Sequence, residues 1–202
     1  MSAREDILRS IRARKPAALP RPAAYRRAMD GDLVERFVAC ANAANATVHV
    51  LDDLAQVPDC VSGLLRARNL AAVVHLPPDP ALEGLGWDRT QISRDAPGPD
   101  DTAISAAPYG VAETGTLVFP ARAASPASWH FRPGFEIAVL HAQNVLPDLE
   151  TALAKLRARD WPHTINIVTG PSRTADIEQT LELGAHGPKA LAILLIRARP
   201  AG

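Results

Sequence analysis

The sequence predicts an α/β fold of three layers, in which helices cover a mixed sheet. Hydrophobic runs typical of buried strands alternate with segments of helical periodicity. In the middle of the chain, short apolar runs separated by small-residue turns predict at least one antiparallel hairpin, so the sheet is expected to be mixed. The 202 residues, 47% hydrophobic and 22% charged, are enough for one domain with a good-sized core.

Residues 1–31 are predicted to form an N-terminal helical arm, and residues 32–202 the α/β domain. Ser2 and Glu5 form a capping box ahead of a short helix, and a proline-rich stretch, 16–22, follows it. The apolar stripe of this helix is too narrow for the helix to be stable alone. We expect it to pack on the main domain or on a neighbouring subunit, and the second alternative implies a homo-oligomer.

The remaining elements follow from local patterns in order along the chain. Asp32 and Glu35 begin a helix, because an acidic first turn and an Asp cap satisfy free N–H groups. Pro147 marks the start of a later helix. A further helix is expected after Thr174. Predicted between and after them are strands at 47–51, 71–76, 102–106, 110–112, 116–119, 135–141, 164–168 and 191–196, a helix at 60–68, and a long loop at 77–101 with one short strand near 90–92.

Composition and cysteine usage exclude several function classes. Lys plus Arg equals Asp plus Glu at 22 each, so no overall positive field favours nucleic acid. The N-terminus has neither signal-peptide nor membrane-span character. Cys40 and Cys60 form no disulfide framework and cannot hold a four-cysteine iron–sulfur cluster, and the histidines show no metal-binding spacing. We therefore expect a cytoplasmic protein with no membrane span, and with no iron–sulfur cluster or metal in this chain.

Three small-residue segments are predicted to form the walls of one anion-binding pocket. Glycine permits close backbone approach, hydroxyls donate hydrogen bonds, and cations attract a carboxylate or phosphate. A strand that ends in a hydroxyl-rich turn before a helix adds free N–H groups. The candidate ligand-binding residues are Thr114, Gly115, Thr116, Gly170, Ser172, Arg173, Thr174, Asp176, His186, Gly187 and Lys189. The plainer alternative is that these glycines and hydroxyls only form turns and helix caps.

Glu113 and the segment around His130 each allow two interpretations. Glu113 is the candidate catalytic carboxylate, because it lies between a strand and a threonine-glycine turn, but a solvated turn glutamate fits the same position. Trp129 and Phe131, around His130, form either a lid or part of the core.

The ordered motifs of the chain resemble one known family. The segments Tyr109–Val118, Ile137–Leu140, Val168–Ile177 and Gly184–Pro188 are similar to the LUD domain of the lactate-utilisation protein C (LutC/YkgG) family, over residues 30–197. One departure is Glu136, at a position where relatives often have histidine.

The resemblance implies a fold similar to the NagB/RpiA/CoA-transferase-like superfamily and a role in oxidising L-lactate to pyruvate beside iron–sulfur partner proteins. No settled catalytic residue comes with the domain. The expected function is therefore a non-iron–sulfur component of an L-lactate utilisation system that binds a small anionic or nucleotide-like ligand. The alternative is a stand-alone transferase or isomerase in which Glu113 attacks or deprotonates a CoA ester or sugar phosphate.

Overall fold

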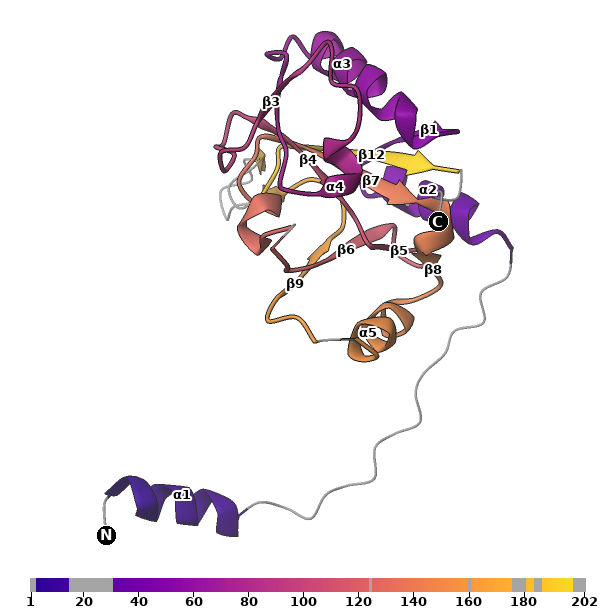
Figure 1. Cartoon of the computed structure of the whole chain (residues 1–202). Coiled ribbons are helices and arrows are strands. Elements are labelled where there is room, and N and C mark those ends of the chain that lie inside the picture. Colours follow the sequence, from indigo (N-terminus) through magenta and orange to yellow (C-terminus); the bar gives the residue numbers. More distant parts are fainter. Residues whose placement is uncertain are drawn as a thin grey trace.

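The structure, a computed structural model, describes residues 3–14, 31–123, 125–159, 161–175, 181–183 and 187–197 and confirms the α/β fold. Its layers are a helix, a parallel sheet, a second helix beside a smaller sheet, and a last helix (Figure 1). The helices are α1 (Ala3–Ala13), α2 (Leu33–Ala43), α3 (Val57–Ala67), α4 (Pro80–Glu83) and α5 (Leu149–Arg157), with 3-10 turns η1 (Leu54–Gln56), η2 (Ala127–His130) and η3 (Ala142–Asn144).

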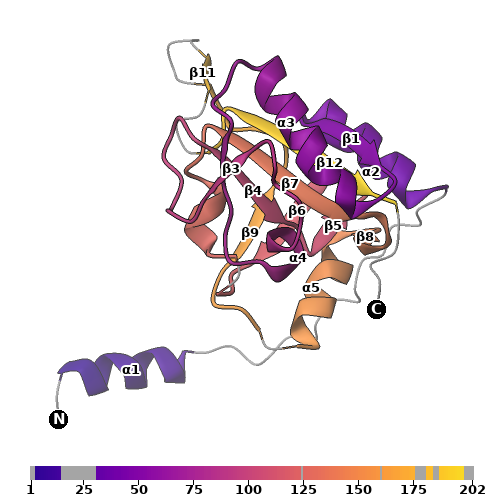
Figure 2. The same cartoon turned by 45° about the horizontal axis from the view of Figure 1, so that its top comes forward.

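The larger sheet has six parallel strands in the order β1-β12-β7-β4-β2-β3 (Figure 2). They are β1 (Thr47–Leu51), β2 (Val73–His75), β3 (Gln91–Ser93), β4 (Thr102–Ala106), β7 (Phe135–His141) and β12 (Ala190–Ile196). The two long strands β7 and β12 lie side by side at the centre, and both are buried nearly throughout. Such strands read as continuous hydrophobic runs because both faces of a parallel sheet are covered.

The smaller sheet is the mixed one. Its order is β8-β5-β6-β9, with β5 parallel to β8 and the other pairs antiparallel. Its strands are β5 (Tyr109–Val111), β6 (Thr116–Pro120), β8 (Val145–Leu146) and β9 (Ile165–Val168). The predicted hairpin is the β5–β6 pair, so the antiparallel strands form a sheet of their own.

Three apolar clusters hold the layers together. The first joins α2 and the smaller sheet to one face of the parallel sheet, around Phe37, Phe119 and Leu140. The second packs α3 and α4 on the opposite face. The third packs α5 on the outer face of the smaller sheet. Burial of these apolar surfaces is the main favourable contribution to folding.

Local start signals placed most elements correctly. The Asp32 side chain accepts hydrogen bonds from the N–H groups of Val34 and Glu35 and begins α2 as predicted. The helix predicted at 60–68 begins three residues earlier, because a capping box at Asp53 already orders the chain ahead of it. The loop at 77–101 contains the unpredicted α4, which Asp79 caps.

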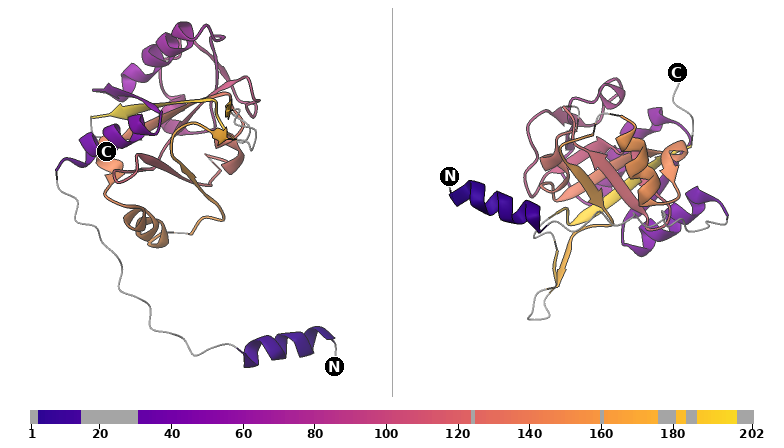
Figure 3. Two further views of the ribbon diagram at one scale, coloured as in Figure 1. Left: turned by 180° about the vertical axis from the view of Figure 1, so that it is seen from behind. Right: turned by 90° about the horizontal axis from the view of Figure 1, so that it is seen from below.

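The helix predicted after Thr174 is not found in the described residues on either side of positions 176–180, which lie outside the described residues. Strand β10 (Arg173–Ala175) follows the turn and pairs antiparallel with β11 (Leu181–Leu183), as a ribbon that projects from the domain (Figure 3). Just before β10, the N–H of Ser172 donates to the carbonyl of Pro188 at 2.9 Å, so the chain leaves the turn extended. Strand pairing therefore overrides the local preference at Arg173–Ala175.

No residue of α1 is buried, so packing of this helix on the described part of the domain is not observed. Packing on a second subunit stays a prediction. Among the described residues, none of the helices has the length and apolar character needed to cross a membrane.

Candidate functional site

The turn at Glu113–Thr116 connects β5 to β6 and is shaped by its contact with α2. Gly115 has φ +68°, and a methyl group there would overlap the backbone nitrogen of Ala41. This glycine is therefore needed so that the turn can approach the helix, and the space beside it is filled by protein. The ligand contact predicted for Gly115 has a packing explanation.

The turn after β9 repeats this arrangement. Gly170 has φ +69°, and a methyl group on it would overlap the carbonyl oxygen of Ala44, just past the end of α2. Both glycine turns thus enclose the C-terminal half of one helix. That end of a helix carries the negative end of its dipole, so it does not favour an anion.

The predicted segments do meet in space where the structure describes them. Because β6 and β9 are antiparallel, the hydroxyls of Thr116 and Thr169 lie 2.6 Å apart, and the hydroxyl of Thr114 lies 2.6 Å from that of Thr116. Ser172 then touches the third segment, since its N–H bonds to Pro188 and a methyl on Gly187 would lie 3.1 Å from its Cβ. Asp176 and His186 lie outside the described residues.

The two predicted cations that the structure describes, Arg173 and Lys189, do not gather around one space. Arg173 is exposed on the strand that leaves the domain. Lys189 is exposed and its Nζ lies 3.4 Å from Asp100 Oδ1, as a surface ion pair. The three segments are therefore adjacent, but a cation-lined pocket between them is not seen in the described part of the chain.

Glu113 is partly buried at the start of its turn. Its N–H donates to the carbonyl of Pro147 at 3.1 Å, and its carbonyl lies 3.6 Å from Cys40 Sγ. These contacts fix the turn to the segment just before α5 and to α2. The catalytic role of Glu113 stays a prediction.

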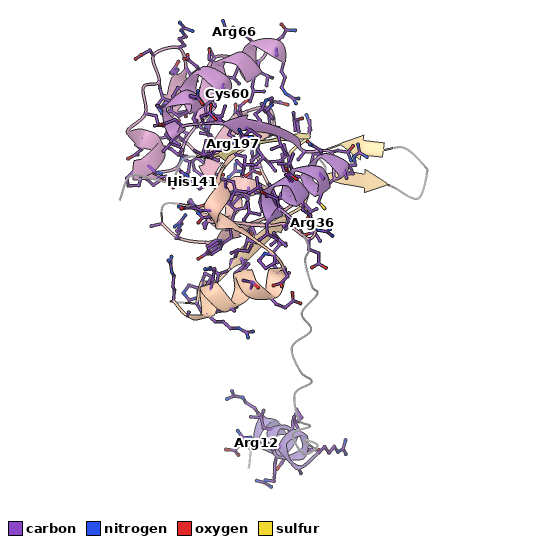
Figure 4. The ribbon with its side chains drawn as sticks, turned by 90° about the vertical axis from the view of Figure 1, so that its right-hand side faces the viewer. Arg12, Arg36, Cys60, Arg66, His141 and Arg197 are labelled. Atoms are coloured by element: carbon purple, nitrogen blue, oxygen red, sulfur yellow. The ribbon has the colours of Figure 1, made fainter. Side chains whose placement is uncertain are left out.

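A cavity of about 350 Å³ lies elsewhere, at the carboxyl ends of β4 and β7. Ligands of open α/β sheets usually bind at this edge, and the volume suits a small ligand. Figure 4 labels His141, the last residue of β7, and Arg197, which follows the neighbouring β12. The cavity is lined by Leu54, Asp79, Ala81, Leu82, Ala106, Ala107, Pro108, Tyr109, Arg122, Val139, His141, Asn144 and Arg159.

Three of the polar residues that line this cavity are basic. Arg122 comes from the segment after β6 and Arg159 from the end of α5, and among the described residues neither has an ion-pair partner. His141 Nδ1 is buried and has no hydrogen-bond partner in the described part of the chain. The one carboxylate, Asp79, already accepts a hydrogen bond from the N–H of Ala81. Two guanidinium groups and an imidazole can bind a carboxylate or a phosphate.

A second polar feature, which we call the buried relay, consists of Ser105, Ser125, His130 and Glu136. His130 Nδ1 lies 2.7 Å from Glu136 Oε1, and its Nε2 lies 3.1 Å from Ser125 Oγ. Ser105 Oγ lies 3.5 Å from both His130 Nδ1 and Glu136 Oε1. His130 is 0% exposed and Glu136 is 1% exposed, so the whole relay is inside the protein.

Its position between the two sheets explains its electrostatics. Along β7 the side chains alternate, so Glu136 faces the smaller sheet with Ala138, and Phe119 stacks on the His130 ring at 3.9 Å. Burial raises the pKa of Glu136, while the hydrogen bonds and charge of His130 and the Ser105 hydroxyl act in the opposite direction. Glu136 Oε2 has no partner in the described part of the chain.

For Trp129 and Phe131, on either side of His130, the two alternatives were a lid or part of the core. Trp129 is buried and belongs to the core, whereas Phe131 is exposed.

Sequence reasoning missed both the cavity and the relay. A lone histidine six residues before a glutamate carries no motif, and the cavity residues are scattered over more than a hundred positions. The only available signal was Glu136, a charged residue inside a hydrophobic strand.

Comparison with known proteins assigns the domain that carries these features. A family model described as the LUD domain matches residues 34–196. The chain belongs to the LUD domain family. The match begins in α2 and ends with β12, so the cavity and the relay both lie inside the LUD domain.

Relatives and a solved structure agree with this assignment. YkgG of Escherichia coli K12 is 27% identical over 163 residues, 77% of this chain and 70% of that protein. Lactate utilization protein C of Geobacillus thermodenitrificans NG80-2 is 35% identical over 94 residues, 44% of this chain and only 39% of that protein. A crystal structure of a DUF162 family protein from Deinococcus radiodurans superposes with TM-score 0.62 at 18% identity, over 81% of this chain and 96% of that one. This LUD domain therefore shares its fold with a solved structure, while the likeness to the superfamily of sugar-phosphate and CoA enzymes stays a prediction.

Proposed function

We propose that this LUD domain is the non-iron–sulfur component of an L-lactate utilisation system and binds a small anionic or nucleotide-like ligand in the cavity at the carboxyl edge of its parallel sheet. The pathway is supported by relatives named lactate utilization protein C, although the matched part covers well under half of the Geobacillus protein. The iron–sulfur partners of such a system would carry the electrons, since this chain has only two cysteines.

The ligand proposal is supported by one observation: Arg122 and Arg159 both line the cavity of about 350 Å³. Arg122 follows β6, whereas Arg159 lies between α5 and β9, so the two side chains line the same cavity only in the folded protein. An anion between them would form charge-assisted hydrogen bonds with both, and with His141 or Asn144 beside them. The sequence-predicted residues near Ser172 and Lys189 are the competing location.

Calorimetric titration of the purified protein with L-lactate, inorganic phosphate and ADP tests the site. Arg122→Ala and Arg159→Ala are each expected to weaken binding about 10-fold or more, because hydrogen bonds to charged groups contribute about 1.5–3 kcal/mol. The matched control is Lys189→Ala, which removes an exposed cation outside the cavity and is expected to leave the affinity unchanged. If Lys189→Ala weakens binding and the two arginine variants do not, the ligand binds at the segments near Ser172 and Lys189 instead.

Growth on L-lactate tests the pathway. A strain without this protein is expected to lose growth on L-lactate as the carbon source and to regain it with the wild-type gene. Arg122→Ala should restore growth poorly if the ligand is needed. Unimpaired growth of the deletion strain, in a host with no second lactate dehydrogenase, would remove the pathway assignment.

A further inference from the structure

The buried relay is connected to the lining of the cavity through Arg122. Arg122 and Ser125 form an isolated antiparallel bridge, in which the N–H of Arg122 donates to the carbonyl of Ser125 at 3.1 Å and the N–H of Ser125 donates back at 2.9 Å. Ser125 is buried, whereas Arg122 is exposed at the cavity. The position of the Arg122 backbone therefore depends in part on how Ser125 is held.

Ser125 is held by its side chain. Its hydroxyl lies 3.1 Å from His130 Nε2, and His130 Nδ1 lies 2.7 Å from Glu136 on the central strand β7. A continuous series of hydrogen bonds thus runs from the parallel sheet to the arginine of the cavity. Since β7 pairs with β12 over its whole length and with β4 from Phe135 to Val139, the Glu136 end of the series is rigid.

The segment that carries the relay has further anchors, and one of them holds Ala121, the residue before Arg122. The buried side chain of Asn166 donates to the carbonyl of Ala127 at 2.7 Å and fixes η2. Phe119 stacks on the ring of His130. Upstream, the N–H of Ala121 donates to the carbonyl of Thr164 at 2.8 Å. Within the described residues, only the hydroxyl of Ser125 connects the relay to the bridge that holds Arg122.

A structural purpose alone does not explain this choice of residues. An apolar core of the same volume is often as stable as a buried ion pair, or more stable, because burying charge is costly. Glu136 also leaves one carboxylate oxygen without a partner among the described residues. Buried ionisable groups with incomplete partners occur disproportionately at functional sites.

We propose that His130 and Ser125 are positioning residues for anion binding: through the Arg122–Ser125 bridge they hold the Arg122 guanidinium at the cavity, without touching the ligand themselves. This inference rests on the proposed ligand site. It assigns to Ser125 and His130 the placement of the Arg122 backbone, so that the point from which this side chain reaches the cavity is fixed before the anion arrives. Prior ordering increases affinity because less conformational freedom is lost on binding.

A double-mutant cycle tests the proposal on the whole chain, with L-lactate, inorganic phosphate and ADP as probes. Ser125→Ala is expected to weaken binding about 3- to 10-fold in the wild-type background and not at all in the Arg122→Ala background, since coupled residues are non-additive. Ser125→Thr keeps the hydroxyl and should retain affinity. Ser105→Ala is the matched control, because this hydroxyl touches the same histidine and glutamate but not the bridge.

A second variant keeps the test independent of folding. His130→Phe preserves the ring that stacks on Phe119 and removes both ring nitrogens, and it should reproduce the affinity loss of Ser125→Ala while thermal unfolding shows that the protein is folded. Additive effects of Ser125→Ala and Arg122→Ala, or an equal loss in Ser105→Ala, would overturn the positioning role while the ligand site stands. A wild-type protein that binds none of the three anions would overturn the ligand site and the positioning role together.

Discussion

At the scale of single residues, polarity and space decide what each candidate does. Gly115 and Gly170 were predicted to admit a ligand, and both instead admit the backbone of α2. Sequence shows that a glycine is needed, but it does not show which neighbour approaches it. Glu136 is the reverse: in the sequence it was only a departure from relatives that often have histidine there, and its environment and its partner His130 became evident only from the structure.

The two glycines yield a stability prediction. Gly115→Ala and Gly170→Ala are each expected to lower the free energy of unfolding by about 3 kcal/mol, because they add left-handed backbone strain of about 1–2 kcal/mol and overpacking of about 1–3 kcal/mol. Gly63→Ala in α3 is the matched control, since a methyl there meets nothing within 4 Å. It should stabilise the protein by about 0.5–1 kcal/mol, as alanine does in a helix. Urea unfolding measures all three variants, and equal losses would contradict the packing explanation.

Glu136 yields a prediction about pH. Because burial raises its pKa in the folded protein, this carboxyl holds its proton at pH values where the unfolded chain has lost it. Its contribution to stability is therefore fully present below the unfolded pKa near 4.5 and is lost as the pH rises through the raised pKa. The free energy of unfolding of wild type relative to Glu136→Gln should fall from pH 4 to pH 8.

Urea unfolding between pH 4 and pH 8 measures this dependence. Glu150→Gln on the exposed side of α5 removes the same charge from the surface and serves as the control. If the wild type gains stability relative to Glu136→Gln as pH rises, the direction assigned to the pKa of Glu136 is wrong.

At the scale of elements, local signals predicted an element correctly where nearby side chains satisfy its free backbone N–H groups. The helices α2 and α5 begin at Asp32 and Asp148, whose side chains accept hydrogen bonds from their own first turns. The central strands β7 and β12 of the parallel sheet follow from long, mainly apolar runs. The prediction for the segment after Ser172 failed because its backbone pairs with β11, six to ten positions away, and local preference carries no trace of that partner. The cavity was missed for the same reason: its arginines come from connections whose convergence only the two-sheet arrangement creates.

At the scale of the whole molecule, two sheets packed face to face bury the main core, and α1 contributes nothing to it. The apolar cluster between the sheets includes Leu117, which is fully buried, whereas Ile7 and Ile11 of α1 are 60% and 61% exposed. The stability of the domain should therefore be independent of the apolar stripe of α1.

Replacing Ile7 and Ile11 together by serine is expected to change the free energy of unfolding by no more than about 0.5 kcal/mol, which is usual for surface positions. Leu117→Ala should cost about 2–5 kcal/mol, because it removes buried methyl groups and leaves a cavity between the sheets. Urea unfolding at a low protein concentration compares the two variants, and sedimentation at high concentration shows whether the stripe joins subunits. A loss near 2 kcal/mol in the double serine variant, at the same molecular mass, would mean that α1 packs on its own domain in solution.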